Sequence, residues 1–147
     1  MEAQSQSPAG AVAAAFGVLC RGYKKNVARA CDKLGCGHYG ARRVGGRSHG
    51  GVDVKCSDGS AVYAPFDGKL VGRIRPYGNK NKIDDGFKLI GNGLCVMLFY
   101  IKPDKYTGNV KKGQRIGTML PMQAVYPGIT SHIHVQMCDR SNPTRYL

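Results

Sequence analysis

Six cysteines in a chain of 147 residues constrain this sequence more than any other feature. Their number is even, no two of them form a C-x-x-C pair, and small secreted domains commonly use such sets as disulfides. The alternative, a thiolate zinc cluster, usually relies on closely spaced cysteine pairs. We therefore expect three disulfides and an extracellular protein, while the spacing alone leaves their pairing open. The cysteines are Cys20, Cys31, Cys36, Cys56, Cys95 and Cys138.

The charge of the chain limits the class of partner. Lysine and arginine number 22 against nine acidic residues, which gives a formal net charge of +13 on a chain whose length suits one domain. Such a surface attracts polyanions. The alternative is that the charge only keeps the surface solvated, which the spread of basic residues from Arg21 to Arg145 favours. No nucleic-acid-binding motif accompanies the charge. We expect sulfated glycans and cell-surface receptors as partners, no nucleic acid, and leave the oligomeric state open.

The amino-terminal residues resemble part of a secretion signal. Residues 9–20 (AGAVAAAFGVLC) form an apolar run, but Glu2 stands where a signal peptide carries a basic start. The run is shorter than the roughly 20 apolar residues that cross a bilayer, so we expect no membrane span. We predict a weak or truncated signal-like segment over residues 1–19 and one module over residues 20–147.

Beyond Gly50 the sequence consists of short β-rich runs separated by Gly, Pro and Asp. Asp58-Gly59, Asp67-Gly68 and Lys112-Gly113 are typical of tight turns between strands. This pattern predicts an all-β fold, a mostly antiparallel sandwich or open barrel. Before it, a short helix is expected around Lys25 to Lys33. The predicted strands are Gly51 to Cys56, Ala61 to Pro65, Lys69 to Ile74, Phe87 to Ile90, Leu94 to Ile101, Gln114 to Leu120 and His132 to Cys138.

Two histidine patterns point to a metal site. In an extended strand His132 and His134 share one face, and the residues between and after them face the core. His49 and Asp53 would stand roughly 13 Å apart in a straight strand, so the intervening Gly-Gly pair must turn or bulge the chain to bring them together. A helical i, i+4 pairing is the rival geometry, which two glycines disfavour. Two imidazoles, one carboxylate and an open position form a catalytic-type zinc site.

Four motifs carry a family resemblance. They are His49-x-x-x-Asp53, Tyr63-Ala64-Pro65-x-x-Gly68-x-x-Val71-Gly72, Val110-Lys111-x-Gly113-Gln114-x-Ile116-Gly117 and His132-x-His134. Together they resemble the lysostaphin-type zinc endopeptidases of bacterial cell-wall lysis, which share a mostly antiparallel β core. From Cys20 to Leu147, with all six cysteines, the chain is more similar to a vertebrate group of chemotactic leukocyte and myeloid proteins that carry this module once or twice.

The resemblance implies specific roles for residues of this chain. It implies that His49, Asp53 and His134 hold Zn²⁺ and that His132 lies close to a metal-bound water. It also implies three disulfides, which join Cys20 with Cys56, Cys31 with Cys36, and Cys95 with Cys138.

One position departs from the active peptidases. Those enzymes have Tyr-x-His-Leu on the central strand, where this chain has Leu98-Phe99-Tyr100-Ile101, so Tyr100 replaces a second histidine. A phenol with a pKa near 10 is protonated at neutral pH and is a poor general base. We expect no enzyme but a secreted, zinc-binding, cytokine-like chemotactic protein. The alternatives are an active zinc endopeptidase that cuts glycine-rich cell-wall peptides, and a disulfide domain whose histidines bind nothing.

Overall fold

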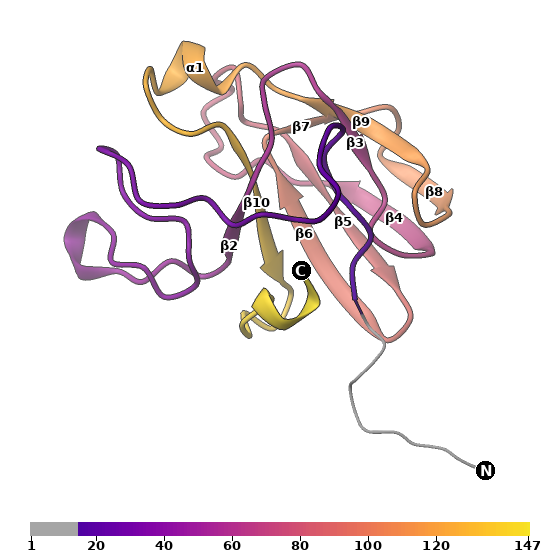
Figure 1. Cartoon of the computed structure of the whole chain (residues 1–147). Coiled ribbons are helices and arrows are strands. Elements are labelled where there is room, and N and C mark those ends of the chain that lie inside the picture. The colour runs from indigo at the N-terminus through magenta and orange to yellow at the C-terminus, as the bar shows by residue number, and fades with distance from the viewer. Residues whose placement is uncertain (1–14) are drawn as a thin grey trace.

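The computed structural model describes residues 15–147 (Figure 1). The first 14 residues of the predicted signal-like segment lie outside the described range. Within this range no helix has the length and apolar character that crossing a bilayer requires. The strands are β2 (Val52–Lys55), β3 (Ala61–Tyr63), β4 (Gly68–Arg73), β5 (Gly86–Gly91), β6 (Leu94–Phe99), β7 (Ile101–Pro103), β8 (Thr107–Val110), β9 (Arg115–Met119) and β10 (His132–Met137).

The strands form two antiparallel sheets. One sheet has six strands in the order β2-β10-β6-β5-β4-β8, and the other has three in the order β3-β9-β7. The prediction of an all-β, mostly antiparallel fold is confirmed. The helical elements are short: η1 (Val44–Gly46), α1 (Met122–Val125) and η2 (Thr144–Tyr146).

The helix predicted around Lys25 to Lys33 is wrong. The backbone there runs extended beside β2, because Lys55 donates its N–H to Val27 O at 2.8 Å and Arg29 donates its N–H to Asp53 O at 2.7 Å. Ala28 forms an isolated β-bridge with Val54 between these two bonds. The backbone groups that a helix would pair internally are bonded to a strand instead, which is how tertiary pairing overrides helix propensity.

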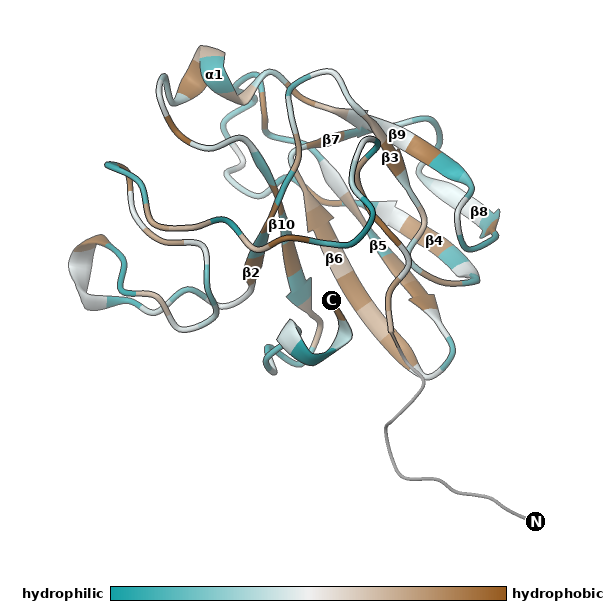
Figure 2. Cartoon of the chain, viewed as in Figure 1, coloured by the Kyte–Doolittle hydropathy of each residue, from teal (hydrophilic) through white to brown (hydrophobic). Residues whose placement is uncertain are grey.

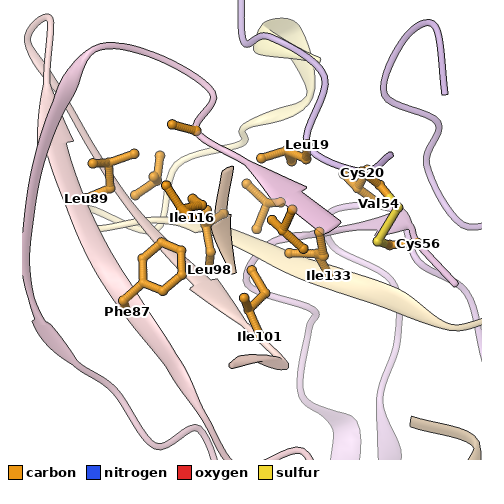
Figure 3. Packing of buried hydrophobic residues seen from close by; sticks show 14 of the residues in the cluster. Leu19, Cys20, Val54, Cys56, Phe87, Leu89, Leu98, Ile101, Ile116 and Ile133 are labelled. Carbon is orange, nitrogen blue, oxygen red and sulfur yellow. A yellow bond between two sulfur atoms is a disulfide. The ribbon is translucent and has the colours of Figure 1, made fainter. Parts of the chain in front are cut away.

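A single hydrophobic core packs the elements together. Figure 2 shows that β5 and β6 are largely apolar. Ile133 and Val135 of β10 belong to this core, as the alternation along the strand predicts, and Figure 3 shows Ile133 in the same cluster as Phe87 and Leu98. Phe16 also lies in the core, so the folded unit includes residues before Cys20.

The six cysteines form three disulfides, and the pairs are those that the resemblance implies. Cys20–Cys56 ties the first described segment to the end of β2, and Cys95–Cys138 joins the start of β6 to the residue after β10. Cys31–Cys36 closes a five-residue interval near the surface. The two wide links each connect segments about forty residues apart and so restrict the unfolded chain more than the short one.

Candidate metal centre

Two neighbouring strands bring Asp53 and His134 together. Asp53 in β2 lies directly opposite His134 in the antiparallel partner β10, so their side chains share one face of the sheet. His49 precedes β2, and the chain bends at Gly51 before the strand begins. This bend returns His49 to the same side, as the Gly-Gly pair predicts. The three side chains form a buried group, here called the His49–Asp53–His134 triad.

The three facing atoms of the triad are almost equally spaced. His49 Nε2 lies 3.0 Å from His134 Nδ1 and 3.0 Å from Asp53 Oδ1, and the last two atoms are 3.2 Å apart. In a tetrahedral zinc site with bonds of about 2.0–2.1 Å, neighbouring ligand atoms lie about 3.3 Å apart. The triad therefore has the spacing of three ligands around one ion.

The outer nitrogens of both rings fix which nitrogens face inward. His49 Nδ1 donates to the carbonyl oxygen of His38 at 2.9 Å, and His134 Nε2 donates to Gln136 Oε1 at 2.9 Å. In the neutral rings the inward nitrogens consequently carry lone pairs and no hydrogen. Two lone pairs and a carboxylate oxygen cannot hydrogen-bond to one another, so this donor set fits a cation such as Zn²⁺.

Asp53 uses its second oxygen to bind arginine. Arg29 Nη1 donates to Asp53 Oδ2 at 3.0 Å, and Arg43 Nη2 lies 3.6 Å from the same oxygen. Burial opposes ionisation of Asp53, but the charged and hydrogen-bonding groups around it hold the pKa of the carboxyl well below its usual range. The carboxylate is thus charged and oriented before any metal arrives. Sequence reasoning missed both arginines.

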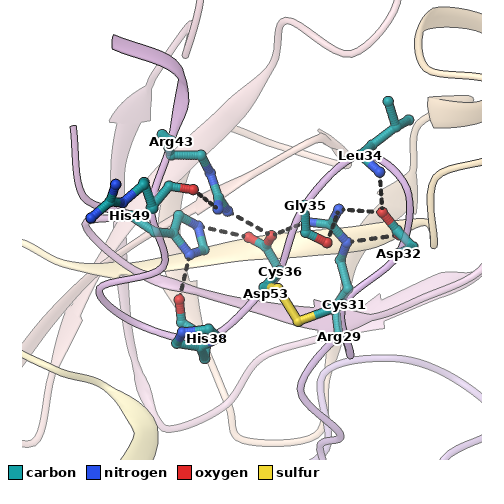
Figure 4. The surroundings of a disulfide bond; sticks show 11 residues. Arg29, Cys31, Asp32, Leu34, Gly35, Cys36, His38, Arg43, His49 and Asp53 are labelled. Atoms are coloured by element: carbon teal, nitrogen blue, oxygen red, sulfur yellow. Dashed lines mark hydrogen bonds and ion pairs between the residues drawn. A yellow bond between two sulfur atoms is a disulfide. The ribbon is translucent and has the colours of Figure 1, made fainter. Parts of the chain in front are cut away.

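Residues 29–38 form an outer layer around the triad (Figure 4). Arg29 also binds the carboxylate of Asp32 and the carbonyl oxygen of Gly35, and the Gly37 carbonyl accepts the N–H of Asp53 at 2.8 Å. The Cys31–Cys36 disulfide closes this segment beside Arg29. Such outer contacts orient metal ligands and contribute to metal affinity. The sulfur atoms of this pair lie near His38, but because they form a disulfide they are not available as thiolate ligands for a metal.

Gly51 permits the close contact between β2 and β10. A Cβ at this position would collide with the carbonyl oxygen of Val135 and lie 2.9 Å from the ring of His134. We expect Gly51→Ala to lower the free energy of unfolding by about 1–3 kcal/mol and to weaken zinc binding, measured by urea denaturation and by competition with a zinc indicator dye. Gly50→Ala is the control, because its Cβ would meet only the end of the Arg140 side chain. Equal behaviour of the two variants would contradict this role.

His132 lies next to the triad and is not part of it. Its Nδ1 donates to the carbonyl oxygen of Thr130 at 2.7 Å, and its Nε2 is 3.3 Å from Asp53 Oδ2. Burial lowers the pKa of His132, so its neutral form is favoured at neutral pH. A neutral imidazole in this place can accept a hydrogen bond from a group bound at the metal.

Tyr100, for which the motif resemblance predicts a histidine in active peptidases, lies beside His132. The two rings meet edge to face with centroids 5.6 Å apart. Burial raises the pKa of Tyr100 to about 12, so the hydroxyl keeps its proton at neutral pH. Its backbone adopts a left-handed conformation, φ +75°, between β6 and β7, where the predicted strand from Leu94 to Ile101 divides in two. The protonated hydroxyl can donate a hydrogen bond.

A cleft of about 490 Å³ opens over the triad. Tyr77 and Tyr126 join Tyr100 in its wall, and their hydroxyls form a chain with O–O distances of 3.1 and 3.2 Å through Tyr77. Met122, Phe99 and Ile129 add apolar surface to the lining. Near Tyr100 the lining of the cleft therefore consists of apolar side chains and tyrosine hydroxyls. The triad forms another part of the lining.

Asp84 holds the loop that carries Tyr77. Its buried carboxylate accepts the backbone N–H groups of Tyr77, Gly78 and Lys80 at 2.7–3.1 Å. Hydrogen bonds to a charged acceptor are stronger than neutral ones. We expect Asp84→Ala to speed hydrogen exchange at these three amides by about tenfold or more, measured by NMR. Asp104→Ala, at an exposed position, is the control. Unchanged exchange would show that Asp84 does not hold the loop.

A family model described as peptidase family M23 matches residues 47–145. The matched range contains the whole triad and His132. The chain belongs to peptidase family M23. The motifs predicted a peptidase-type fold, and this prediction is confirmed.

The curated relatives in this family carry names that refer to leukocytes or myeloid cells. The chain is 56% identical to leukocyte cell-derived chemotaxin-2 of Mus musculus and 54% identical to that of Bos taurus, in each case over 137 residues, 93% of this chain and 90% of the relative. It is 56% identical over 134 residues to myeloid protein 1 of Gallus gallus, covering 90% of this chain and 41% of that protein. The relatives' names support a chemotactic protein built on a family M23 fold.

Proposed function

We propose that this protein is a secreted, zinc-binding signal that attracts leukocytes, and that it is not a working peptidase. The identity to two proteins named chemotaxin-2, over nearly their full length, carries the proposal. Three disulfides support an extracellular location. The domain assignment is part of the same proposal: a module over residues 20–147 and a signal-like segment over residues 1–19, of which Phe16 and Leu19 pack in the core of the module.

The triad supports zinc as the metal. His49 Nε2, His134 Nδ1 and Asp53 Oδ1 would hold it, and Arg29 keeps the carboxylate turned toward the two rings. A bound zinc ion acts as a Lewis acid and lowers the pKa of its water. In this protein we assign the group a binding and structural role, because it would link β2, β10 and the segment before β2.

Tyr100 supports the absence of peptidase activity. The protonated phenol can donate a hydrogen bond to an anion, but it cannot take a proton from water at neutral pH. Loss of one general acid or base typically costs about 100- to 10,000-fold in rate. His132 remains near the triad and, together with the match to peptidase family M23, favours an active peptidase as the second candidate.

A peptidase assay separates the two candidates. Zinc-loaded protein is incubated with a pentaglycine substrate, and the release of shorter peptides is followed by mass spectrometry with and without chelator. We expect no chelator-sensitive cleavage by the unchanged protein. Tyr100→His serves as the comparison, since it places an imidazole beside His132. Cleavage by the unchanged protein that stops on chelation would overturn the non-enzymatic assignment.

A migration assay tests the signalling role. Leukocytes are exposed to a gradient of the zinc-loaded protein across a filter, and directional migration is expected. His134→Ala should reduce migration, whereas His38→Ala should not, because the His38 side chain is exposed and only its carbonyl contacts His49. Cell-surface receptors, and sulfated glycans drawn by the net charge of +13, are the proposed partners. No migration toward the intact protein would refute this role.

A further inference from the structure

Three arginines in the lining of the cleft have at most one long ion pair with a carboxylate. Arg43, Arg47 and Arg140 all line it, and within residues 15–147 neither Arg47 nor Arg140 forms a salt bridge. The fourth lining arginine, Arg29, is already neutralised by two carboxylates. Asp53 is the one carboxylate among the described lining residues. The cleft therefore carries positive charge beyond what its own residues compensate.

Two of these arginines lie next to the triad. Arg43 Nη2 is 3.6 Å from Asp53 Oδ2. Arg140 Nη2 lies 3.1 Å from the position that a Cβ on Gly50, the residue after His49, would occupy. The Tyr39 hydroxyl donates to the carbonyl oxygen of Arg140 at 2.6 Å and so fastens the loop of Arg43 to the turn after β10. This contact ties together the two segments that carry Arg43 and Arg140, and both arginines line the cleft.

The remaining lining suits an apolar side chain. Phe99, Met122 and Ile129 contribute apolar surface, and the tyrosine hydroxyls of the wall are already bonded to one another. A glycine-only peptide offers no side chain for this surface. A ligand that has both a carboxylate and an apolar side chain uses each part of the cleft.

We propose that this cleft binds a peptide through a free carboxylate, held by Arg43 and Arg140 next to the metal. Guanidinium groups bind carboxylates through two parallel hydrogen bonds, and carboxylate oxygens are ordinary zinc ligands. The inference rests on the proposed zinc site for the metal contact, but the arginine contacts do not require zinc. It adds a ligand class to the proposed function: a peptide with a C-terminal carboxylate and an apolar last residue.

Paired peptides test the proposal on the full chain. N-acetyl-Gly-Gly-Phe with a free C-terminus is titrated into zinc-loaded protein by calorimetry and compared with the same peptide as its C-terminal amide. We expect the amide to bind about tenfold more weakly or worse. N-acetyl-Gly-Gly-Glu-amide, which moves the carboxylate to a side chain, should bind no better than the Phe amide. Equal affinity of the acid and the amide would overturn the proposal.

Three variants that each remove one positive charge show which arginines bind the peptide carboxylate. Arg43→Gln and Arg140→Gln should each weaken the acid peptide by about tenfold without changing the affinity for the amide. Arg21→Gln, an exposed residue outside the cleft, removes the same charge and should change neither. Identical behaviour of all three variants, at equal zinc content, would refute the arginine site. So would a heparin tetrasaccharide that binds through these arginines more tightly than the acid peptide.

Zinc content, measured on every sample, separates failure of the two proposals. If the protein holds no zinc, the zinc-binding function fails, and the arginine site is then judged on metal-free protein. There the acid peptide should still bind better than the amide, and Arg43→Gln should still reduce the difference. If neither the zinc-loaded nor the metal-free protein bound the acid peptide better than the amide, the arginine site alone would be contradicted.

Discussion

Replacing Arg29 with methionine is expected to lower the free energy of unfolding of the metal-free protein by about 3–5 kcal/mol. Arg29 and Asp53 are both buried, and the substitution would leave the carboxylate without its main cationic partner. It would also remove the contacts of Arg29 with Asp32 and Gly35. Urea denaturation monitored by circular dichroism measures the change.

A control variant and the pH dependence show whether lost charge pairing causes the destabilisation. Arg29→Lys keeps the charge but loses the forked geometry, so we expect a smaller loss than with methionine. Because the pKa of Asp53 lies below its usual range in the folded state, its contribution to stability is complete at neutral pH and is lost as the pH falls below about 4. The difference in the free energy of unfolding between Arg29→Met and the unchanged protein should therefore become smaller in acid. A gap that is independent of pH would mean that the lost energy is packing and not charge pairing.

Zinc is expected to stabilise the folded protein by about 4 kcal/mol when free zinc exceeds the dissociation constant about 1,000-fold. For a domain of this size the gain corresponds to a rise in melting temperature of roughly 10 °C. The metal would bind the folded state, because the triad assembles residues that are more than eighty positions apart in the chain. Calorimetry with zinc, and again after chelator, measures the shift.

A pair of histidine variants controls the zinc experiment. His134→Ala removes one inward nitrogen and should abolish the response to zinc. His38→Ala removes an exposed imidazole but keeps the carbonyl oxygen that accepts from His49, so its response should match that of the unchanged protein. A zinc response that survives His134→Ala would place the ion elsewhere.

The sequence allowed the triad to be predicted because each of the two histidine patterns that contribute to it has a local geometry. His132 and His134 share a strand face by the two-residue period of β-structure, and the Gly-Gly pair marks the bend that returns His49 to Asp53. The resemblance to zinc peptidases supplied the link between the two strands. Arg29 could not be predicted, because its contact with Asp53 spans 24 residues of unremarkable basic sequence.

The fold was predictable where hydrophobic alternation is strong and not where pairing alone defines a strand. Each predicted run from Gly51 onward contains a strand, but β8 was missed because Thr107-Gly108-Asn109-Val110 has the composition of a turn. β8 forms only by pairing with β4. The wrongly predicted helix has the same origin, since the backbone around Ala28 is bonded to β2. Tyr100 shows a third case, a left-handed residue that alternation does not reveal.

X-ray absorption spectroscopy at the zinc edge tests the central claim, that His49, Asp53 and His134 bind one ion. We predict one zinc per chain, nitrogen and oxygen neighbours at about 2.0–2.1 Å, and the outer scattering of two imidazole rings. His134→Ala should lose the metal or one ring from the spectrum. Sulfur neighbours at about 2.3 Å, or a spectrum unchanged by His134→Ala, would contradict the account.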